Sequence, residues 1–325
     1  MEYIHGLKNF KMNRPSAVMI GKFDGFHLGH QRLLRKLQTL AQSEGIASIV
    51  IAFDMVPLLK EKGLLTGVLM ERSEKRVYLQ DKVDYFVDCP FDASVSEMQA
   101  ERFIRDELAE KLCVRHVVVG ADFRFGKDRR GDVQMLEHYQ ESYGYELHIV
   151  PDVYRGYEKI SSHLVKDDLV AGRFQEVNSQ LGHPWQIFGR VNHGRALGKN
   201  TFGMATINIT PDPVKALPPY GVYVVGVEIK DPYDISRMQE GAAGRMIPGV
   251  ANLGIKPTVG GQKTPDVEVH LIDFDQEIYG EQVVVSFYEF LRPEKKFDSY
   301  QALKEQMQRD LSAARAAWRD MTYTD

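Results

Sequence analysis

The sequence has few cysteines: Cys89 and Cys113 are the only two in 325 residues. Their separation fits neither a disulfide framework nor metal-ligand spacing, so we expect both to be buried apolar residues in a reducing compartment rather than catalytic thiols. The sequence also lacks an excess of charge of either sign, because 41 basic and 45 acidic side chains give a net charge of −4. Proteins that bind nucleic acid usually carry a basic footprint, so this composition argues against nucleic acid as a partner.

Long hydrophobic runs are missing as well. No stretch of eighteen apolar residues is present, which excludes an ordinary membrane-spanning helix, and residues 1–8 lack the apolar core of a secretion signal. We therefore expect no membrane association and a cytoplasmic location. The hydrophobic fraction of 43% is that of a globular protein, and 325 residues are enough for two ordinary domains.

The first half of the chain alternates strand-like and helical patterns. Apolar, β-branched runs predict strands at 18–20, 48–53, 85–87, 116–119 and 146–150, and helical periodicity predicts helices near 27–43, 71–81, 97–112 and 132–142. Strands separated by helix-sized segments favour a doubly wound parallel sheet, in which ligands bind beyond the carboxyl ends of the strands. We expect this α/β domain to span residues 1–182.

The second half has a different texture. Short strands follow one another closely between Gly and Pro turns, with predicted strands at 186–191, 205–209, 220–225, 267–272 and 283–287. Such spacing is typical of a small β-barrel. Apolar residues at helical spacing between Ser299 and Asp320 predict one closing helix. We expect this second domain to span residues 183–325.

The most informative segment is His27-Leu28-Gly29-His30, which follows an apolar strand and a turn containing Gly21 and Gly25. The strand, glycine turn and helix start place two imidazoles where unpaired backbone N–H groups and the helix dipole favour phosphate. Histidines at such a point can donate hydrogen bonds to phosphate oxygens as charge develops in a nucleotidyl transfer. Four residues alone are a weak signal, and a chance pair or a metal fragment is the plainer interpretation of an isolated His-x-x-His.

The wider context resembles a known family. Residues 21–30 (GKFDGFHLGH) are similar to the first motif of the bacterial bifunctional riboflavin kinase/FAD synthetases, whose N-terminal half belongs to the HxGH nucleotidyltransferases. Further segments resemble the family's motifs in the same order along nearly the whole chain, at 118–127, 160–162, 249–258, 267–275 and 291–297. The resemblance implies riboflavin, FMN and ATP as substrates, FMN and FAD as products, and Mg²⁺ as cofactor. We expect a monomer or a weak homo-oligomer.

For the first half, the resemblance implies a site for FMN adenylylation in which His27 and His30 contact the ATP phosphates. The attacking phosphate oxygen of FMN is already anionic, so positioning and charge stabilisation suffice without a general base. The other nucleotide-binding or phosphate-binding residues implied are Gly21, Phe23, Asp24, Gly25, Gly29, Asp122, Ser161, Ser162 and Lys166. Phe123, Arg124 and Phe125 are the implied flavin contacts, because aromatic and guanidinium planes stack on flat rings; Phe123 and Phe125 could equally be core residues.

For the second half, the resemblance implies a riboflavin kinase site. The riboflavin hydroxyl is neutral and benefits from a base, for which Glu268 in the run Val267-Glu268-Val269 is the candidate. Taken alone, Glu268 reads as an ordinary solvent-facing strand residue. The implied partners are Gly198 and Gly203 for phosphate, Thr206 and Asn208 for Mg²⁺, and Asn252 and Arg292 for the flavin.

Some positions differ from the family's usual pattern. His163 and Lys166 stand where Thr and Arg are common, and Lys lacks the planar fork with which Arg grips phosphate. Met55 and Val56 replace a Pro-His pair, and Ala205 replaces a Pro. Two alternatives therefore stay open beside the bifunctional enzyme: a protein with only one active half, and a non-catalytic regulator that binds flavin or nucleotide.

Overall fold

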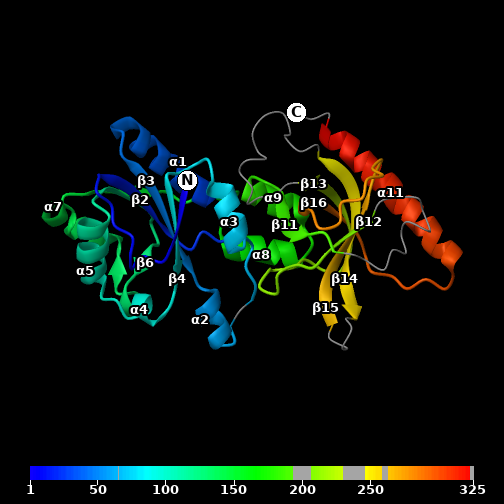
Figure 1. Ribbon diagram of the computed structural model, residues 1–325, viewed down its shortest axis with the longest axis horizontal. Coiled ribbons are helices and arrows are strands. Elements are labelled where there is room, and N and C mark those ends of the chain that lie inside the picture. The colour runs from blue at the N-terminus through cyan, green and yellow to red at the C-terminus, as the bar shows by residue number, and fades with distance from the viewer. Residues whose placement is uncertain (65, 193–205, 230–245, 258–262, 323–325) are drawn as a thin grey trace. The chain divides into compact units, whose positions relative to one another are not determined.

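Apolar and β-branched runs in the first half of the chain form one parallel sheet (Figure 1). The strand order is β1-β4-β3-β2-β5-β8, and every neighbouring pair is parallel. The strands are β1 Glu2–His5, β2 Ser16–Gly21, β3 Ala47–Asp54, β4 Tyr85–Pro90, β5 Val114–Gly120 and β8 Glu146–Val150. This computed structural model describes residues 1–64, 66–192, 206–229, 246–257 and 263–322.

Helices cover both faces of this sheet, because each face buries alternate strand residues. On one face, Leu37 of α1 and Leu79 of α3 pack in a core that includes Met19. On the other face, η1 and α6 bury Leu108 and Leu136. The helices are α1 Leu28–Glu44, α2 Val56–Glu61, α3 Arg72–Leu79, α4 Ala93–Ser96, α5 Ala100–Arg102, the π-helix η1 Phe103–Lys111, the 3₁₀-helix η2 Lys127–Arg129, α6 Val133–His138 and α7 Gln140–Tyr143.

The doubly wound parallel sheet predicted for the first half is confirmed, although the structure differs from the predicted elements in several details. The short helices α2 and α4 were not predicted. The strand β1 was not predicted. It has only four residues, too few to show a hydrophobic period, and it forms by pairing with β4. The helix predicted at 97–112 starts at Ala100 and continues as the π-helix η1. The helix predicted at 132–142 is divided into α6 and α7 at Tyr139.

The second half of the chain forms an antiparallel sheet in the order β11-β16-β13-β14-β15-β12, curled into a half-barrel. A bridge between Asn192, just after β11, and Asn208 of β12 joins the two edge strands of this curled sheet. The elements are α8 Ser162–Val170, α9 Phe174–Leu181, β11 Trp185–Arg190, β12 Thr206–Ile209, β13 Gly221–Ile229, β14 Ile247–Pro257, β15 Lys263–Leu271, β16 Gln282–Pro293 and α11 Tyr300–Thr322. The first half of the chain also has two two-stranded ribbons. One pairs β6 Arg124–Phe125 with β7 Gly131–Asp132, and the other pairs β9 Tyr154–Arg155 with β10 Glu158–Lys159.

The half-barrel has an aromatic interior and a helix on its outside. The rings of Phe174, Trp185, Tyr223 and Phe287 contact one another within 6.2 Å between centroids and fill the concave side. On the convex side, Ala314 of α11 packs in a cluster with valines of β13 and β14. The predicted β-barrel fold and its closing helix are therefore confirmed. The strand β14 was not predicted, because its Gly and Pro residues mask the period of two.

The chain divides into two compact units, Met1–Leu164 and Val165–Asp325, each with its own core. Nowhere in the described ranges is there a helix with both the length and the apolar character needed to cross a membrane.

The two cysteines lie in the first unit and form no disulfide. Cys89 is 1% exposed, and burial raises the pKa of its thiol to about 12, so it stays protonated and unreactive near neutral pH. Cys113 is only half-buried and sits near the backbone oxygen of Met12.

Candidate active sites

The turn between β2 and α1 is unusually tight, and its residues explain why. Gly25 has a φ of 88°, and Phe23 and Phe26 are also held at positive φ, of 47° and 43°. Such angles strain ordinary side chains and need support from packing, which the stacked Phe23 and Phe26 rings supply. Gly21 must be glycine for a related reason, because a Cβ there would lie 2.7 Å from the Phe23 ring. Phe23 is thus buried, and it shapes the turn from inside the core.

This turn delivers His27 to the N-cap position of α1 and His30 to its first turn. The two imidazoles stack with centroids 3.7 Å apart. Gly29 allows the arrangement, since a Cβ there would come within 3.1 Å of the His27 ring. His27 is only 5% exposed. Among the described residues, neither His27 Nδ1 nor His30 Nδ1 has a hydrogen-bond partner, although both atoms are buried.

Both histidines are neutral near pH 7. Burial lowers the pKa of His27 to about 4, with a smaller lowering by Lys159, while Asp24 acts in the opposite direction. Burial also holds the pKa of His30 well below 6.5, with contributions from His27 and Lys75. A buried nitrogen without a partner costs free energy, so the pair is arranged to gain from a ligand that carries negative charge.

Asp24 and Ser162 hold this turn in place. The Asp24 carboxylate accepts hydrogen bonds from the backbone N–H groups of Leu69 and Met70, at 2.7 and 3.1 Å. The Ser162 hydroxyl donates to the Asp24 carbonyl oxygen at 2.7 Å. Ser161 accepts from the N–H of Leu164. Asp24 was predicted as a nucleotide contact. In the structure its hydrogen bonds attach the turn to the segment before α3.

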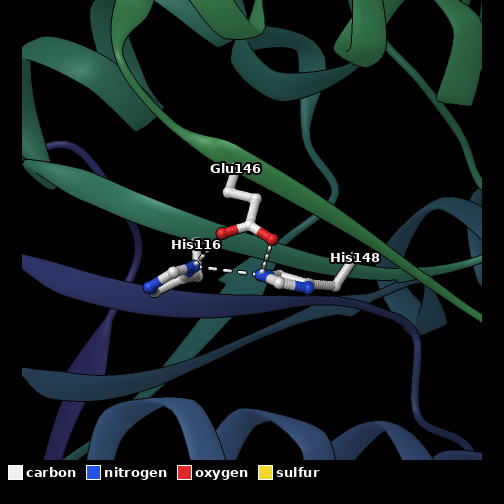
Figure 2. Close-up of side chains that lie close together, drawn as sticks. All are labelled: His116, Glu146 and His148. Atoms are coloured by element: carbon white, nitrogen blue, oxygen red, sulfur yellow. Dashed lines mark hydrogen bonds and ion pairs between the residues drawn. The ribbon is translucent and has the colours of Figure 1, made fainter. Parts of the chain in front are cut away.

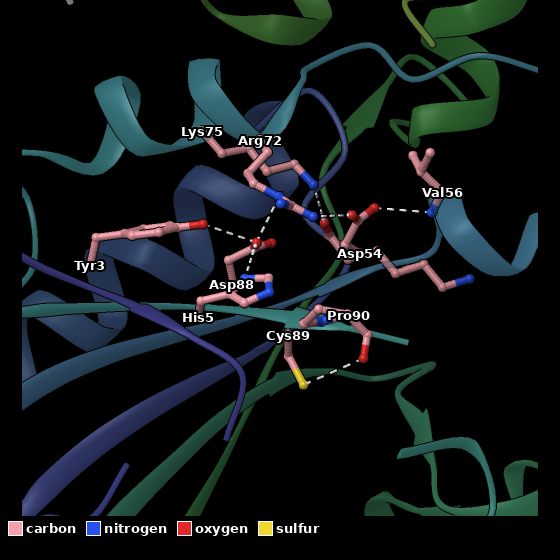
Figure 3. A network of polar contacts seen from close by, with 10 residues as sticks. Tyr3, His5, Asp54, Val56, Arg72, Lys75, Asp88, Cys89 and Pro90 are labelled. Atoms are coloured by element: carbon pink, nitrogen blue, oxygen red, sulfur yellow. Dashed lines mark hydrogen bonds and ion pairs between the residues drawn. The ribbon is translucent and has the colours of Figure 1, made fainter. Parts of the chain in front are cut away.

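That segment is fixed to the sheet by a polar network around Asp88 (Figure 3). Arg72, the first residue of α3, reaches Asp88 of β4 with Nε at 2.7 Å and Asp54 of β3 with Nη2 at 2.8 Å. The Tyr3 hydroxyl donates to the Asp88 carboxylate at 3.1 Å, and Nδ1 of His5 lies 3.4 Å from the same carboxylate. Asp88 is 3% exposed, and a buried carboxylate needs such partners. The network joins β1, β3, β4 and α3 at the carboxyl edge of the sheet.

Three predicted segments meet at this edge because they follow neighbouring parallel strands. The His27 turn follows β2, the loop 121–126 follows β5, and residues 151–162 follow β8, which are consecutive in the sheet. Lys159 joins the last two: its ammonium lies 2.8 Å from Asp122 and 2.9 Å from Asp152. The hydrogen bond from Lys159 lowers the pKa of Asp122.

The predicted flavin-contacting residues differ in exposure. Phe125 is 6% exposed, stacks on Phe123, and packs in the core, where a Cβ on Gly131 would touch its ring. Phe123 is half-buried, and Arg124 is exposed and ion-paired with Asp132 at 2.6 Å. Of the three predicted flavin contacts in the first half, Phe123 and Arg124 present surface that a ligand could contact, and Phe125 does not.

In the second unit, strand register brings predicted residues into one row. Asn208 of β12 lies opposite Glu268 of β15, which lies opposite Asn252 of β14. Val222 of β13 continues the row to Arg292 of β16. Residues opposite one another in neighbouring strands share a face, so these side chains project from the convex side.

The alternation around Glu268 supports this placement. Val267 and Val269 are fully buried in the half-barrel, whereas Glu268 is half-buried on the opposite face. Asn208 is 8% exposed. Two residues earlier, the hydroxyl oxygen of Thr206 lies 3.0 Å from Nδ1 of His270. The amide of Asn252 reaches toward Glu294 at 3.5 Å.

Arg292 has its donors largely occupied. Its Nε and Nη2 contact the Asp310 carboxylate of α11 at 2.7 to 3.1 Å, and Nη1 donates to the Pro293 carbonyl. Asp310 is 6% exposed. Arg292 therefore ties β16 to α11 beside the row of polar residues.

Two predicted site residues, Gly198 and Gly203, lie outside the described residues, as does the substituted Ala205. Lys166 follows Ser162 by four residues in α8, and the two compact units divide inside that helix.

Sequence reasoning missed several polar residues near these sites. Lys159, Lys75 and Arg72 are single cations without a motif, and only the fold brings them to the carboxyl edge. The position of Lys159 immediately before Ile160-Ser161-Ser162 was the one local signal.

Comparison with known proteins agrees with the two units. Residues 9–164 match the family model of FAD synthetase, and residues 181–318 match that of riboflavin kinase. The bifunctional riboflavin kinase/FMN adenylyltransferase of Haemophilus influenzae is 34% identical, covering 97% of this chain and 99% of that one. Its counterpart in Escherichia coli is 35% identical and covers 97% of each chain.

A solved structure has the same fold over almost the entire length. The crystal structure titled as a macrolide-efflux protein from Streptococcus pneumoniae superposes with a TM-score of 0.82 and 28% identity, covering 97% of this chain and 99% of that chain. The two family models and the full-length relatives lead to one assignment: the chain belongs to the family of bifunctional riboflavin kinase/FMN adenylyltransferases.

Proposed function

We propose that the two halves of the chain divide two reactions, with residues 1–182 adenylylating FMN and residues 183–325 phosphorylating riboflavin. Family membership gives the overall activity: riboflavin becomes FMN and FMN becomes FAD, with ATP consumed in both steps. The boundary near Gly182 is supported by the start of the riboflavin kinase match at residue 181.

In the first half, His27 and His30 bind the ATP phosphates. The observation that carries this assignment is the pair of buried Nδ1 atoms without partners at the start of α1, where the backbone N–H groups and the helix dipole favour phosphate. The FMN phosphate oxygen attacks the α-phosphorus and pyrophosphate leaves. Hydrogen bonds from the imidazoles stabilise the charge that develops on the phosphate oxygens.

The remaining parts of this site have supporting tasks. Gly21, Gly25 and Gly29 let the backbone and the His27 ring approach closely, and Asp24 holds the turn. Ser161, Ser162, Lys166 and Asp122 complete the polar surface for the nucleotide. Phe123 and Arg124 contact the flavin, and Phe125 supports them from the core.

In the second half, Glu268 accepts the proton of the riboflavin hydroxyl while that oxygen attacks the γ-phosphorus of ATP. The observation that carries this assignment is the row Asn208–Glu268–Asn252 on one face of the sheet. Asn252 and Arg292 flank the flavin. Gly198 and Gly203, which lie outside the described residues, keep only the phosphate-binding role that the resemblance implies. A carboxylate beside a neutral hydroxyl is the arrangement that general base catalysis requires.

Thr206 and Asn208 suit Mg²⁺, because both offer neutral oxygens two residues apart on one strand face. The ion supplies neutralisation of phosphate charge when it is bound with ATP. Asn208 is nearly buried and so is positioned with little freedom of movement.

The decisive experiment incubates the purified protein with Mg²⁺ and ATP plus either riboflavin or FMN, and resolves the flavins by chromatography. FMN and FAD from riboflavin, and FAD from FMN, are expected. FMN alone would restrict the activity to the second half, and FAD only from supplied FMN would restrict it to the first half. No product in either reaction would favour a regulator that binds without catalysis.

Both reactions use ATP, so we place the protein in the cytoplasm, which cell fractionation tests. We further propose a monomer or a weak homo-oligomer. Light scattering during size-exclusion chromatography measures that mass directly.

A further inference from the structure

Away from the proposed catalytic residues, three side chains converge on one face of the first sheet (Figure 2). They are His116 of β5 with Glu146 and His148 of the edge strand β8, and their ligating atoms lie within 4.8 Å of one another. We propose that this cluster binds a divalent transition-metal ion, of which Zn²⁺ is the probe ion, and that the bound ion ties β8 to β5.

The geometry suits a metal of this class. His116 Nδ1 lies 2.9 Å from His148 Nε2, and the two carboxylate oxygens of Glu146 lie 3.7 Å from these nitrogens. Zinc bonds of about 2.1 Å in a tetrahedron require ligand separations of roughly 3.4 Å, between the observed values. Small side-chain shifts therefore create the coordination shell. Two imidazoles and one carboxylate favour zinc-like ions over Mg²⁺, which prefers oxygen.

A fourth residue, Glu44, orients the His116 ring for metal binding. Glu44, the last residue of α1, lies 2.8 Å from His116 Nε2. An ionised carboxylate can only accept, so this contact places a ring proton of His116 on Nε2, and in the metal-binding tautomer the lone pair of Nδ1 faces His148 and Glu146. Carboxylates in this position orient metal-binding histidines and raise their basicity.

His148 must then change its tautomer before Nε2 can bind the ion. In the ion-free state His148 Nε2–H donates to His116 Nδ1. On binding, the ring takes its other neutral tautomer: the Nε2 proton leaves to water and a proton is taken up at Nδ1, which leaves the Nε2 lone pair for the ion. Burial already lowers the pKa of His148, partly opposed by Glu146, so the ring is neutral. Glu44 and Glu146 contribute negative charge around the ion, and Lys36 contributes one positive charge nearby.

The cluster lies at the opposite end of α1 from the His27 turn. Glu44 ends the helix that His27 begins, and seventeen residues of α-helix span about 25 Å. His116 and Glu146 lie in the amino-terminal parts of β5 and β8, whereas the proposed nucleotide site follows the carboxyl ends. Binding there is thus separable from substrate binding.

The test is calorimetric titration of the tag-free full-length protein with Zn²⁺ in excess Mg²⁺ and without ATP. One ion per chain is expected, together with a rise in melting temperature. His148→Ala should abolish this binding. Glu146→Gln, an exposed change that leaves the core intact, should weaken it more than tenfold, and Glu44→Gln should weaken it about 10- to 100-fold. His138→Ala, at an exposed histidine on α6, is the matched control and should bind as the parent does.

Crystals soaked in Zn²⁺ should give an anomalous peak in contact with His116 Nδ1 and His148 Nε2. Equal affinity in the parent and in both His148→Ala and Glu146→Gln would overturn the proposal. So would an absence of binding, or a peak located only at another histidine.

Discussion

At the residue scale, the state of His27 depends on whether a phosphate is present. The ring sits at the positive end of α1 and is nearly buried, and both conditions favour the neutral form. A bound phosphate reverses this balance, since its negative charge favours protonation and gives the Nδ1 atoms a partner. In the proposed mechanism, the hydrogen bonds from the two histidines strengthen as negative charge develops between the ground state and the transition state, which is the requirement for catalysis.

Replacing both histidines with alanine should separate the two activities. Each removed donor costs about 3 kcal/mol of transition-state stabilisation, so FAD formation by the double variant His27→Ala/His30→Ala should fall below detection. Riboflavin phosphorylation should stay near the parental rate. Initial rates with riboflavin and with FMN measure both, and His138→Ala serves as control. An equal loss of both activities would contradict the assignment of two sites.

The depressed pKa of His27 also predicts a pH dependence of stability. Between pH 4 and 6.5 the unfolded chain binds a proton at this residue that the folded chain does not, so the free energy of unfolding falls as the pH is lowered through this window. The difference between about 4 and 6.5 corresponds to about 3 kcal/mol. Hydrogen exchange of β2 and α1 peptides at pH 7 and 4.5 measures the effect.

His27→Asn should reduce this loss of protection, because asparagine caps a helix without titrating. His138→Asn should leave it unchanged. If the parent and His27→Asn lose the same protection in these peptides on acidification, burial of His27 is not what destabilises the unit.

Glu268→Gln keeps the shape of the side chain and removes its basicity. If the carboxylate accepts the hydroxyl proton, phosphorylation should fall by roughly 10²- to 10⁴-fold with little change in ATP affinity. FAD formation from supplied FMN should persist. Glu281→Gln, at an exposed carboxylate of the same unit, is the control. A Glu268→Gln enzyme with the parental rate would show that the carboxylate is structural.

The residues that sequence could predict are those inside contiguous motifs. The His27 turn was foreseeable because strand, glycines, histidines and helix start are adjacent in the chain. The ion pair of Lys159 with Asp122 and the cluster of His116 with His148 were not, since they depend on which strands become neighbours. The same dependence hid the engagement of Arg292 by Asp310.

At the scale of elements, α11 is fastened to the half-barrel by two arginines of different burial. Arg292 on β16 pairs with the buried Asp310, whereas Arg315 on α11 pairs with Asp273 where both side chains are more than half exposed. A buried carboxylate left without its partner is costly, while an exposed pair contributes little because water screens it.

Arg292→Ala should therefore destabilise the second unit by about 3 kcal/mol, and Arg315→Ala by less than about 1 kcal/mol. Urea unfolding monitored by tryptophan fluorescence reports on this unit, because Trp185 and Trp318 both lie in it. Equal effects of the two substitutions would show that burial of Asp310 does not govern the attachment of α11. A raised KM for riboflavin in Arg292→Ala alone would support the proposed flavin contact.

Elements were predictable where the period of the sequence matches the element. The strands β2, β3, β5 and β8 and the helix α1 follow from apolar runs and helical spacing. Register was not predictable, because the pairing of Asn208, Glu268 and Asn252 joins residues up to 60 positions from their partners. The row of Asn208, Glu268 and Asn252 therefore depends on the register of the whole sheet and cannot be predicted from any one segment.

At the scale of the whole molecule, the proposed histidine and glutamate sites lie in different compact units. FMN made by one site can leave as an ordinary product and bind the other. A protein with only its kinase site and a protein with only its adenylyltransferase site should then complement each other in solution. Mixing full-length His27→Ala/His30→Ala with full-length Glu268→Gln should convert riboflavin to FAD, although the first variant stops at FMN and the second scarcely starts.

The time course makes this test specific. FAD should appear after a lag, because FMN must first accumulate in solution, and doubling the concentration of the first variant should shorten the lag. Added FMN should remove it. Chromatography of samples taken over time measures all three outcomes. If the mixture makes no FAD while each variant keeps its remaining activity, FMN must pass between sites of one chain, and the two units would not function independently.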